Sequence, residues 1–245
     1  MHGTRNEGRA NMISVIIPAY NEFESLRPLT VELLQTMRDL GEDFEILFVD
    51  DGSTDATREV LRSLAGEFDE VRFIGFRKNC GQTSAMAAGF KCARGNILVT
   101  LDADMQNDPA DIPGLLEKLE DYDVVCGWRR KRRDSIVRRI SSRVANSVRN
   151  KLSDEQIVDV GCSLKAYKRE CVEQLKLFEG MHRFLPTLVK LEGYRVVEVP
   201  VNHRERRMGV SKYGIRNRIM KAFIDLLAVR WMKRRHIRYE IEEEG

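Results

Sequence analysis

The feature that most constrains the fold is an alternation of short apolar runs with helical segments over the first half of the chain. The runs are nearly continuous and rich in β-branched residues, as strands buried on both faces are, and they cover residues 13–17, 45–49, 71–76, 97–101 and 124–126. Helical apolar spacing fills residues 22–40, 54–65 and 82–93, and Gly41 and Gly66 are placed to end the first two helices. This alternation predicts an α/β fold with a mostly parallel, Rossmann-like sheet flanked by helices.

The pattern changes after residue 127. A basic helical stretch is expected over 129–151, strands over 162–167 and 196–201, and a long amphipathic helix over 213–235. No internal repeat or low-complexity linker interrupts the chain. We therefore expect a flexible N-terminus over 1–11, one α/β domain over 12–213, and a basic C-terminal helix and tail over 214–245.

The charges of the chain are strongly segregated. The 41 Lys and Arg residues nearly balance the 38 Asp and Glu residues, which gives a net charge of +3. Residues 129–151 nevertheless hold ten basic residues and one acid, and residues 202–238 hold twelve basic residues and two acids. A chain with two such basic segments and an acidic remainder is suited to binding anions on one side.

Composition also excludes some classes of protein. The most apolar helical segment, residues 219–232, contains Lys221, Asp225 and Arg230, and no run approaches the ~20 apolar residues that a membrane-spanning helix needs. The five cysteines are odd in number and irregularly spaced, which predicts neither a disulfide framework nor a zinc site and favours a reducing, cytoplasmic location.

Polar loops follow three of the predicted strands, at residues 18–22, 50–53 and 102–104. Ligands of parallel α/β sheets bind at the carboxyl ends of the strands, so these loops predict one shared site. Neither G-x-G-x-x-G after the first strand nor G-x-x-x-x-G-K-[ST] is present. A dinucleotide-dependent dehydrogenase and a P-loop NTPase are therefore disfavoured.

The third of these loops contains two aspartates in a D-x-D pattern. Asp102 and Asp104 are separated by one residue on an extended segment, so their carboxylates point the same way, and Gln106 lies two residues further. Oxygen ligands of this kind suit Mg²⁺ or Mn²⁺. The alternative interpretation is an acidic surface loop that binds only water.

Several segments, taken in order, resemble the motifs of family 2 glycosyltransferases, which have the GT-A fold. These segments are 15–22 (VIIPAYNE), 49–55 (VDDGSTD), 79–81 (NCG) and 101–106 (LDADMQ). Later segments are similar to the dolichol-phosphate mannosyltransferase branch, which glycosylates polyprenyl phosphates: 127–129, 138–146, 182–184 and 209–213. The resemblance spans residues 13–213 in the order of the family.

The resemblance implies roles for individual residues. Asp102, Asp104 and Gln106 would bind Mg²⁺ or Mn²⁺ on the diphosphate of the donor. The catalytic set would be Asp104, Arg129, Arg143 and Ser147. The nucleotide-sugar would be held by Pro18, Tyr20, Glu22, Val49, Asp51, Asp102, Ala103, Arg206 and Lys212. Of these, Arg129, Arg143, Ser147, Arg206 and Lys212 match family positions that contact donor and acceptor phosphates, and arginine is suited to that task by its bidentate fork.

An expected motif is missing. Family 2 enzymes that glycosylate sugar hydroxyls resemble one another in carrying an acidic general base in a Glu-Asp motif, whereas residues 178–183 here read FEGMHR. Glu179 is a poorly placed substitute. A phosphate acceptor is already ionised near neutral pH and needs no base, so this absence favours in-line displacement by a phosphate with inversion at the sugar carbon.

The resemblance and the missing base motif together imply an inverting, metal-dependent transferase. It would move a hexose, mannose or glucose, from a GDP- or UDP-sugar to dolichyl or undecaprenyl phosphate at the cytoplasmic face of a membrane. The segment 219–232 either packs on the domain or lies on the membrane with Trp231 and the basic residues 233–236. A membrane partner subunit, or spanning segments beyond this region, would be other ways to reach the lipid.

Two alternatives remain at this point. One is an enzyme of the same fold that glycosylates a polysaccharide or protein hydroxyl. The other is a non-catalytic basic module that binds membranes or nucleic acid, although the basic segments contain few aromatic residues for stacking on bases, which argues against nucleic acid as a partner.

Overall fold

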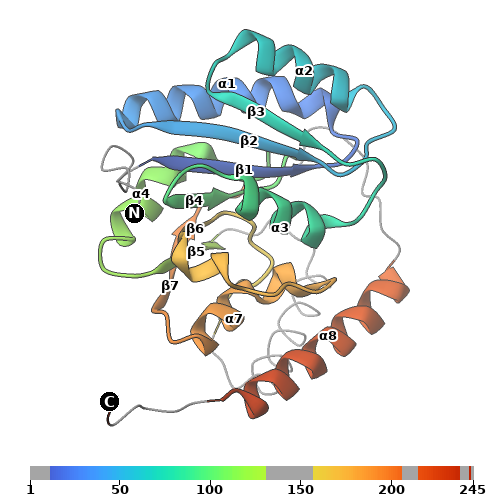
Figure 1. Ribbon diagram of the computed structural model, residues 1–245. Coiled ribbons are helices and arrows are strands. Elements are labelled where there is room, and N and C mark those ends of the chain that lie inside the picture. Colours follow the sequence, from blue (N-terminus) through green and yellow to red (C-terminus); the bar gives the residue numbers. More distant parts are fainter. Residues whose placement is uncertain (1–11, 131–156, 206–214, 238–242, 244–245) are drawn as a thin grey trace, which may run out of the picture.

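The computed structural model describes residues 12–130, 157–205, 215–237 and 243, with side chains described from 224 onward in the last helix. A seven-stranded sheet forms its centre, in the order β3-β2-β1-β4-β6-β5-β7 (Figure 1). β6 is antiparallel to both of its neighbours, β4 and β5, and every other pairing is parallel. The strands are β1 Ile13–Ala19, β2 Phe44–Asp50, β3 Val71–Gly75, β4 Ile97–Thr100, β5 Val124–Arg129, β6 Lys165–Lys168 and β7 Val196–Val201. The predicted mostly parallel α/β sheet is confirmed.

Helices cover both faces of this sheet. They are α1 Phe23–Leu40, α2 Thr57–Glu67, α3 Gln82–Cys92, η2 Pro109–Asp111, α4 Ile112–Lys118, α6 Glu170–Glu173, η3 Met181–Phe184, α7 Leu185–Leu191 and α8 Ile215–Arg235. Figure 1 shows α1 and α2 on the side of the sheet opposite to α3. The inner strands of the sheet are therefore buried on both faces, which explains why they read as continuous apolar runs, whereas the edge strands β3 and β7 are only partly buried.

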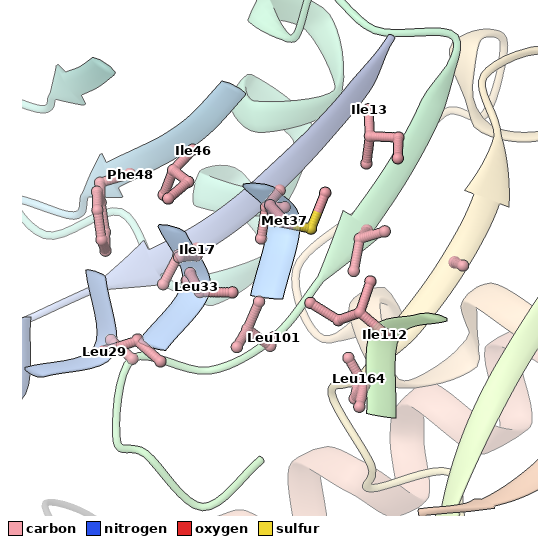
Figure 2. Close-up of a cluster of buried hydrophobic side chains, with 14 of the residues drawn as sticks. Ile13, Ile17, Leu29, Leu33, Met37, Ile46, Phe48, Leu101, Ile112 and Leu164 are labelled. Carbon is pink, nitrogen blue, oxygen red and sulfur yellow. The ribbon is translucent and has the colours of Figure 1, made fainter. Parts of the chain in front are cut away.

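The core is divided by the sheet into two main clusters. In the first, Leu29, Leu33 and Met37 of α1 pack against Ile17 of β1 and Phe48 of β2 (Figure 2). The second lies on the opposite face, where the side chains of Ile16, Leu47 and Val49 meet α3 and α7. Alternate residues of one strand thus serve opposite faces, as the two-residue period of a strand requires.

The helix ends agree with the sequence in one case and differ in two. Gly41 caps α1 in the left-handed region (φ 72°), as predicted. Gly66 does not end α2, because Phe68 N–H still bonds to Leu64 O and the helix runs to Glu67. α2 also begins three residues later than predicted, at Thr57, whose N–H bonds to the side chain of Asp55 (2.9 Å).

Candidate active site

The loops after β1, β2 and β4 meet at one edge of the sheet, as the sequence predicts. Ala19 at the end of β1 pairs with Asp50 at the end of β2, and Ile16 pairs with Thr100 at the end of β4. The 18–22 loop is then fixed to the loop after β2: Asn21 N–H donates to Ser53 Oγ (2.9 Å), and Asn21 Oδ1 accepts from Thr54 N–H (2.8 Å). Asn21 is held at φ 53°, a left-handed conformation that asparagine tolerates better than most residues.

The two consecutive aspartates after β2 have different structural tasks. Asp50 is fully buried, accepts from Ser53 N–H (2.9 Å) and forms an ion pair with Arg58 (2.6 Å). Arg58 also donates to the carbonyl of Phe76. Asp50 therefore shapes the turn from within the protein.

Asp51 organises the neighbouring 79–81 loop. Its carboxylate accepts from the backbone N–H groups of Cys80 (2.7 Å) and Gly81 (2.9 Å) and from Asn79 Nδ2 (2.9 Å). Burial raises the pKa of Asp51, while the N–H groups of Cys80 and Gly81 act in the opposite direction. The carboxylate oxygens of Asp51 therefore hold the 79–81 loop in place. The contact of Asp51 with the nucleotide remains a prediction.

The D-x-D loop runs from Asp102 to Asn107. Asp102 Oδ1 accepts from Gln82 Nε2 at the start of α3 (2.9 Å), and Asp104 Oδ1 accepts from the backbone N–H of Gln106 (3.1 Å). Met105, between them, lies at φ 60°. Asn21 and Met105 are the two non-glycine residues of the described chain in the left-handed region, and both lie in loops at this edge.

The two aspartates are electrostatically suited to a divalent cation. Burial raises the pKa of Asp102, and the nearby charge of Asp104 raises it further, while hydrogen bonding to Ser163 and the charges of Lys165 and Arg129 act in the opposite direction. A cation between two close carboxylates removes their repulsion. Among the described residues no cluster of three His, Cys, Asp or Glu side chains forms a metal site. The two aspartates, the amide of Gln106 and phosphate oxygens of a substrate would complete a magnesium-type ligand set.

Ser163 joins the two ends of the D-x-D loop and was not predicted from the sequence. Its hydroxyl accepts from Asp102 N–H (3.2 Å) and donates to Asn107 Oδ1 (2.7 Å), and its carbonyl accepts from Thr100 Oγ1 (2.8 Å). The buried ammonium of Lys165, at the start of β6, donates to the carbonyl of Cys162. No motif marks these residues; they reach the site because β6 lies beside β4.

Arg129 forms a bidentate ion pair with Asp159. Its Nε lies 2.6 Å and its Nη2 2.8 Å from the carboxylate oxygens, and both side chains are mostly buried. The backbone N–H groups of Val158 and Asp159 donate to Glu198 on β7 (2.8 and 3.1 Å). The predicted phosphate contact of Arg129 is untested, but the structure adds a structural partner that the sequence did not indicate.

A further group of polar residues borders the site. Thr83, next to Gln82 on α3, accepts from Gly180 N–H (3.0 Å) and lies 2.7 Å from His182 Nδ1. His203 Nε2 lies 3.5 Å from Gln106 Nε2 in the D-x-D loop. Neither Thr83 nor His203 was identified as a site residue from the sequence. For His182, the similarity of residues 182–184 to family motifs was the only indication.

The other predicted residues fall into two groups. Pro18, Tyr20 and Glu22 are half-buried at the edge, whereas Val49 and Ala103 are buried in the core. Arg143, Ser147, Arg206 and Lys212 lie outside the described residues.

Comparison with known families and sequences gives a consistent result. The model of the family "Glycosyl transferase family 2" matches residues 14–176. A dodecaprenyl-phosphate galacturonate synthase of Rhizobium johnstonii is 38% identical over 240 residues, which cover 96% of this chain and 71% of the relative. An undecaprenyl-phosphate 4-deoxy-4-formamido-L-arabinose transferase of Proteus mirabilis is 38% identical over 221 residues, covering 89% and 68%.

Solved structures agree on the fold. Glucosyl-3-phosphoglycerate synthase of Mycobacterium tuberculosis, solved with Mn²⁺ and UDP, matches with a TM-score of 0.68 at 19% identity. The match covers 92% of this chain and 80% of the synthase chain. A mannosyltransferase of Pyrobaculum calidifontis, solved with GDP-Man and Mn²⁺, has a TM-score of 0.65 at 23% identity, covering 93% and 65%. This likeness establishes the GT-A fold that the sequence motifs predicted.

Proposed function

Because the chain belongs to glycosyl transferase family 2, we propose that it transfers a sugar from a nucleotide-sugar to a polyprenyl phosphate. The similarity to two relatives that are named for polyprenyl-phosphate substrates, over 96% and 89% of this chain, is the observation that carries the acceptor. The half-buried pair Asp102 and Asp104 at the carboxyl edge of the sheet supports the donor half of the reaction.

A divalent cation is the cofactor that this donor set fits. Asp102, Asp104 and Gln106 would hold Mg²⁺ or Mn²⁺, and the bound ion would stabilise the negative charge of the departing diphosphate. Gln82 orients the carboxylate of Asp102, and Ser163 fixes its backbone. Two proteins of the same fold were solved with Mn²⁺, which supports a divalent ion without choosing between the two metals.

The reaction that fits this site is a single displacement. An oxygen of the acceptor phosphate forms a bond to the anomeric carbon while the bond from that carbon to the diphosphate breaks, and the configuration inverts. The phosphate loses no proton, so no general base is required. Residues 178–183 are consistent with this mechanism, because they contain no Glu-Asp motif and their one acidic residue, Glu179, is exposed.

The identity of the transferred sugar is less closely defined than that of the acceptor. We retain mannose and glucose from the sequence motifs and add galacturonate and 4-deoxy-4-formamido-arabinose, because the relatives are named for them. A few hydrogen bonds to sugar hydroxyls are enough to change which donor sugar is accepted, so family membership does not fix this choice.

The place of the reaction follows from the acceptor. Within the part of the chain that the structure describes, no helix is both long and apolar enough to cross a membrane. A polyprenyl phosphate is anchored in a bilayer by its lipid chain, so we propose that the protein works at the cytoplasmic surface of a membrane. The comparisons lend no support to a partner subunit, and we propose none.

Transfer to a short polyprenyl phosphate tests this function. Purified protein with Mn²⁺ or Mg²⁺ is incubated with GDP-mannose, UDP-glucose and the nucleotide-linked forms of the two other sugars, and lipid-linked sugar is measured. We expect product with at least one donor, and an Asp104→Ala variant should lose about 100-fold or more in rate. Asp39→Asn, an exposed change on α1, is the matched control.

Two outcomes would contradict the proposal. Equal rates for the wild type and the Asp104→Ala variant would show that the aspartate pair is not used. Transfer to sugar or protein hydroxyls with none to polyprenyl phosphate would favour the hydroxyl-glycosylating alternative, in which case Glu179→Gln should remove the activity.

A further inference from the structure

The last helix, α8, is apolar on two opposite faces. Leu226 and Val229 are buried, whereas Ile224, Leu227 and Trp231 are 58%, 45% and 64% exposed. With 3.6 residues per turn, residues 224, 227 and 231 project from one side, and residues 226 and 229 project from the other. The apolar residues of segment 219–232 therefore do not form one stripe: Leu226 is buried, whereas Leu227 and Trp231 are exposed.

The inner face fixes α8 to the domain. Leu226 and Val229 pack with Phe184, and Met232 packs against a second small cluster that contains Met181 and Leu188. Near its C-terminal end, His236 lies 3.7 Å from Glu192, just after α7. Figure 1 shows α8 running along the outside of the domain, next to α7. These contacts fix which side of α8 packs on the domain and leave the opposite side exposed.

This attachment also relates α8 to the candidate active site. Gly180 has φ 87°, and a Cβ there would collide with the carboxylate of Asp225, so α8 lies directly against this turn. Gly180 N–H donates to Thr83, whose neighbour Gln82 donates to Asp102. Only a few contacts thus separate the helix from the D-x-D loop.

Two exposed arginines border the outer face. Arg234 and Arg235 are exposed, and they lie three and four residues after Trp231, which places them on the same side of the helix as that indole. We define the outer face of α8 as Ile224, Leu227, Trp231, Arg234 and Arg235. An aromatic ring and aliphatic side chains beside cationic ends are the composition of a helix that lies in a membrane interface.

We propose that the outer face of α8 binds the surface of an anionic lipid bilayer and holds the active-site edge of the sheet near that surface. This inference rests on the proposed function, because a polyprenyl phosphate acceptor resides in a bilayer. Three apolar side chains cover far less than the roughly 800 Å² per partner of a stable protein interface, which disfavours a second copy of the chain as the occupant. The arginines match the negative charge of anionic headgroups.

Co-sedimentation with vesicles tests the proposal. The full chain is mixed with vesicles of phosphatidylglycerol and phosphatidylcholine, or of phosphatidylcholine alone, and the bound fraction is measured. We expect binding to the anionic vesicles that falls with added salt. The double variant Leu227→Ser/Trp231→Ser should weaken it about tenfold or more. Arg234→Glu/Arg235→Glu should weaken it at least about 25-fold, since each near-surface arginine contributes roughly fivefold.

Matched controls separate this face from the rest of the surface. Val31→Ser removes an exposed apolar side chain from α1, and Arg62→Glu reverses an exposed charge on α2. Both should bind vesicles as the wild type does. The altered side chains of the α8 variants lie outside the core, so we expect these variants to fold. Circular dichroism checks this.

The assay of transfer distinguishes this inference from the proposed function. With a short, water-soluble polyprenyl phosphate, the α8 variants should match the wild type; with a long acceptor embedded in anionic vesicles, they should be about tenfold slower or more. Vesicle binding that the α8 variants do not alter would overturn the inference even if transfer is observed. A change of oligomeric state in those variants, measured by light scattering, would overturn it in favour of a second copy. Absence of transfer in the wild type, with vesicle binding as expected, would count against the proposed function alone.

Discussion

The hydroxyl of Ser163 donates to Asn107 Oδ1 across 2.7 Å while it accepts from the backbone N–H of Asp102. One side chain thus connects the first and last residues of the D-x-D loop. Met105, inside that loop, has φ 60°, a conformation that costs about 1–3 kcal/mol and persists only where surrounding contacts enforce it. Ser163 is one of those contacts.

Removal of the Ser163 hydroxyl should weaken metal binding. In a Ser163→Ala variant we expect the affinity for Mn²⁺, measured by electron paramagnetic resonance with nucleoside diphosphate present, to fall about 10- to 100-fold, the usual effect of losing a group that orients metal ligands. Ser163→Thr keeps the hydroxyl and should recover most of the affinity. Ser63→Ala, on the exposed face of α2, is the control. Unchanged Mn²⁺ affinity in Ser163→Ala would show that the loop holds its shape without this hydroxyl.

Two glycines of the chain should respond in opposite directions to alanine. Gly52 lies at φ 71°, and a Cβ there would collide with the backbone of Lys78, so Gly52→Ala should destabilise the protein by about 2 kcal/mol or more. Gly66 lies within α2 with open space around it, so Gly66→Ala should stabilise by about 0.5–1 kcal/mol. Urea unfolding measures both, and a Gly52→Ala variant as stable as the wild type would refute the tight packing of this turn.

The Arg129–Asp159 pair predicts a loss of stability separate from any effect on catalysis. Arg129→Met would leave the mostly buried carboxylate of Asp159 without its guanidinium, at a cost of about 3–5 kcal/mol. The double variant Arg129→Met/Asp159→Asn should recover part of that loss. A double-mutant cycle in urea measures the coupling. If Arg129 acts only on a substrate phosphate, the single variant will be as stable as the wild type.

Asp123 should contribute to the loss of stability in acid. Burial alone would raise the pKa of Asp123, but hydrogen bonds from Arg195 N–H, from Lys168 and from the Arg195 side chain, with the charge of Lys168, outweigh it and lower the pKa to about 2. Because the folded pKa lies below the unfolded value near 3.8, the stabilisation is present above about pH 4 and is lost as the pH falls toward 2.

Asp123→Asn tests this pH dependence. The variant should be less stable than the wild type by about 1–2 kcal/mol at pH 7, and the difference should disappear between about pH 4 and pH 2. Asp121→Asn, an exposed change two residues away, should behave as the wild type across the same range. A constant difference between Asp123→Asn and the wild type at every pH would rule out the ionised carboxylate as the cause.

Local patterns predicted much of the candidate site. Asp102 and Asp104 follow an apolar run that becomes β4, and Asn21 and Asp51 follow β1 and β2, so the carboxyl-edge rule for parallel sheets was enough to bring these loops together. The reason is that hydrophobic periodicity and polar strand ends are properties of neighbouring residues.

The amino-acid sequence by itself determined the α/β class and predicted the edge of the candidate site and its aspartate pair, because each depends on residues close together in the chain. The tertiary structure decided two other features. β6 enters the sheet antiparallel beside β4, and this pairing alone brings Ser163 to Asp102, about 60 positions earlier. Likewise, a helix that is apolar on two sides does not indicate which side is buried; only packing on Phe184 buries Leu226 and leaves Trp231 exposed.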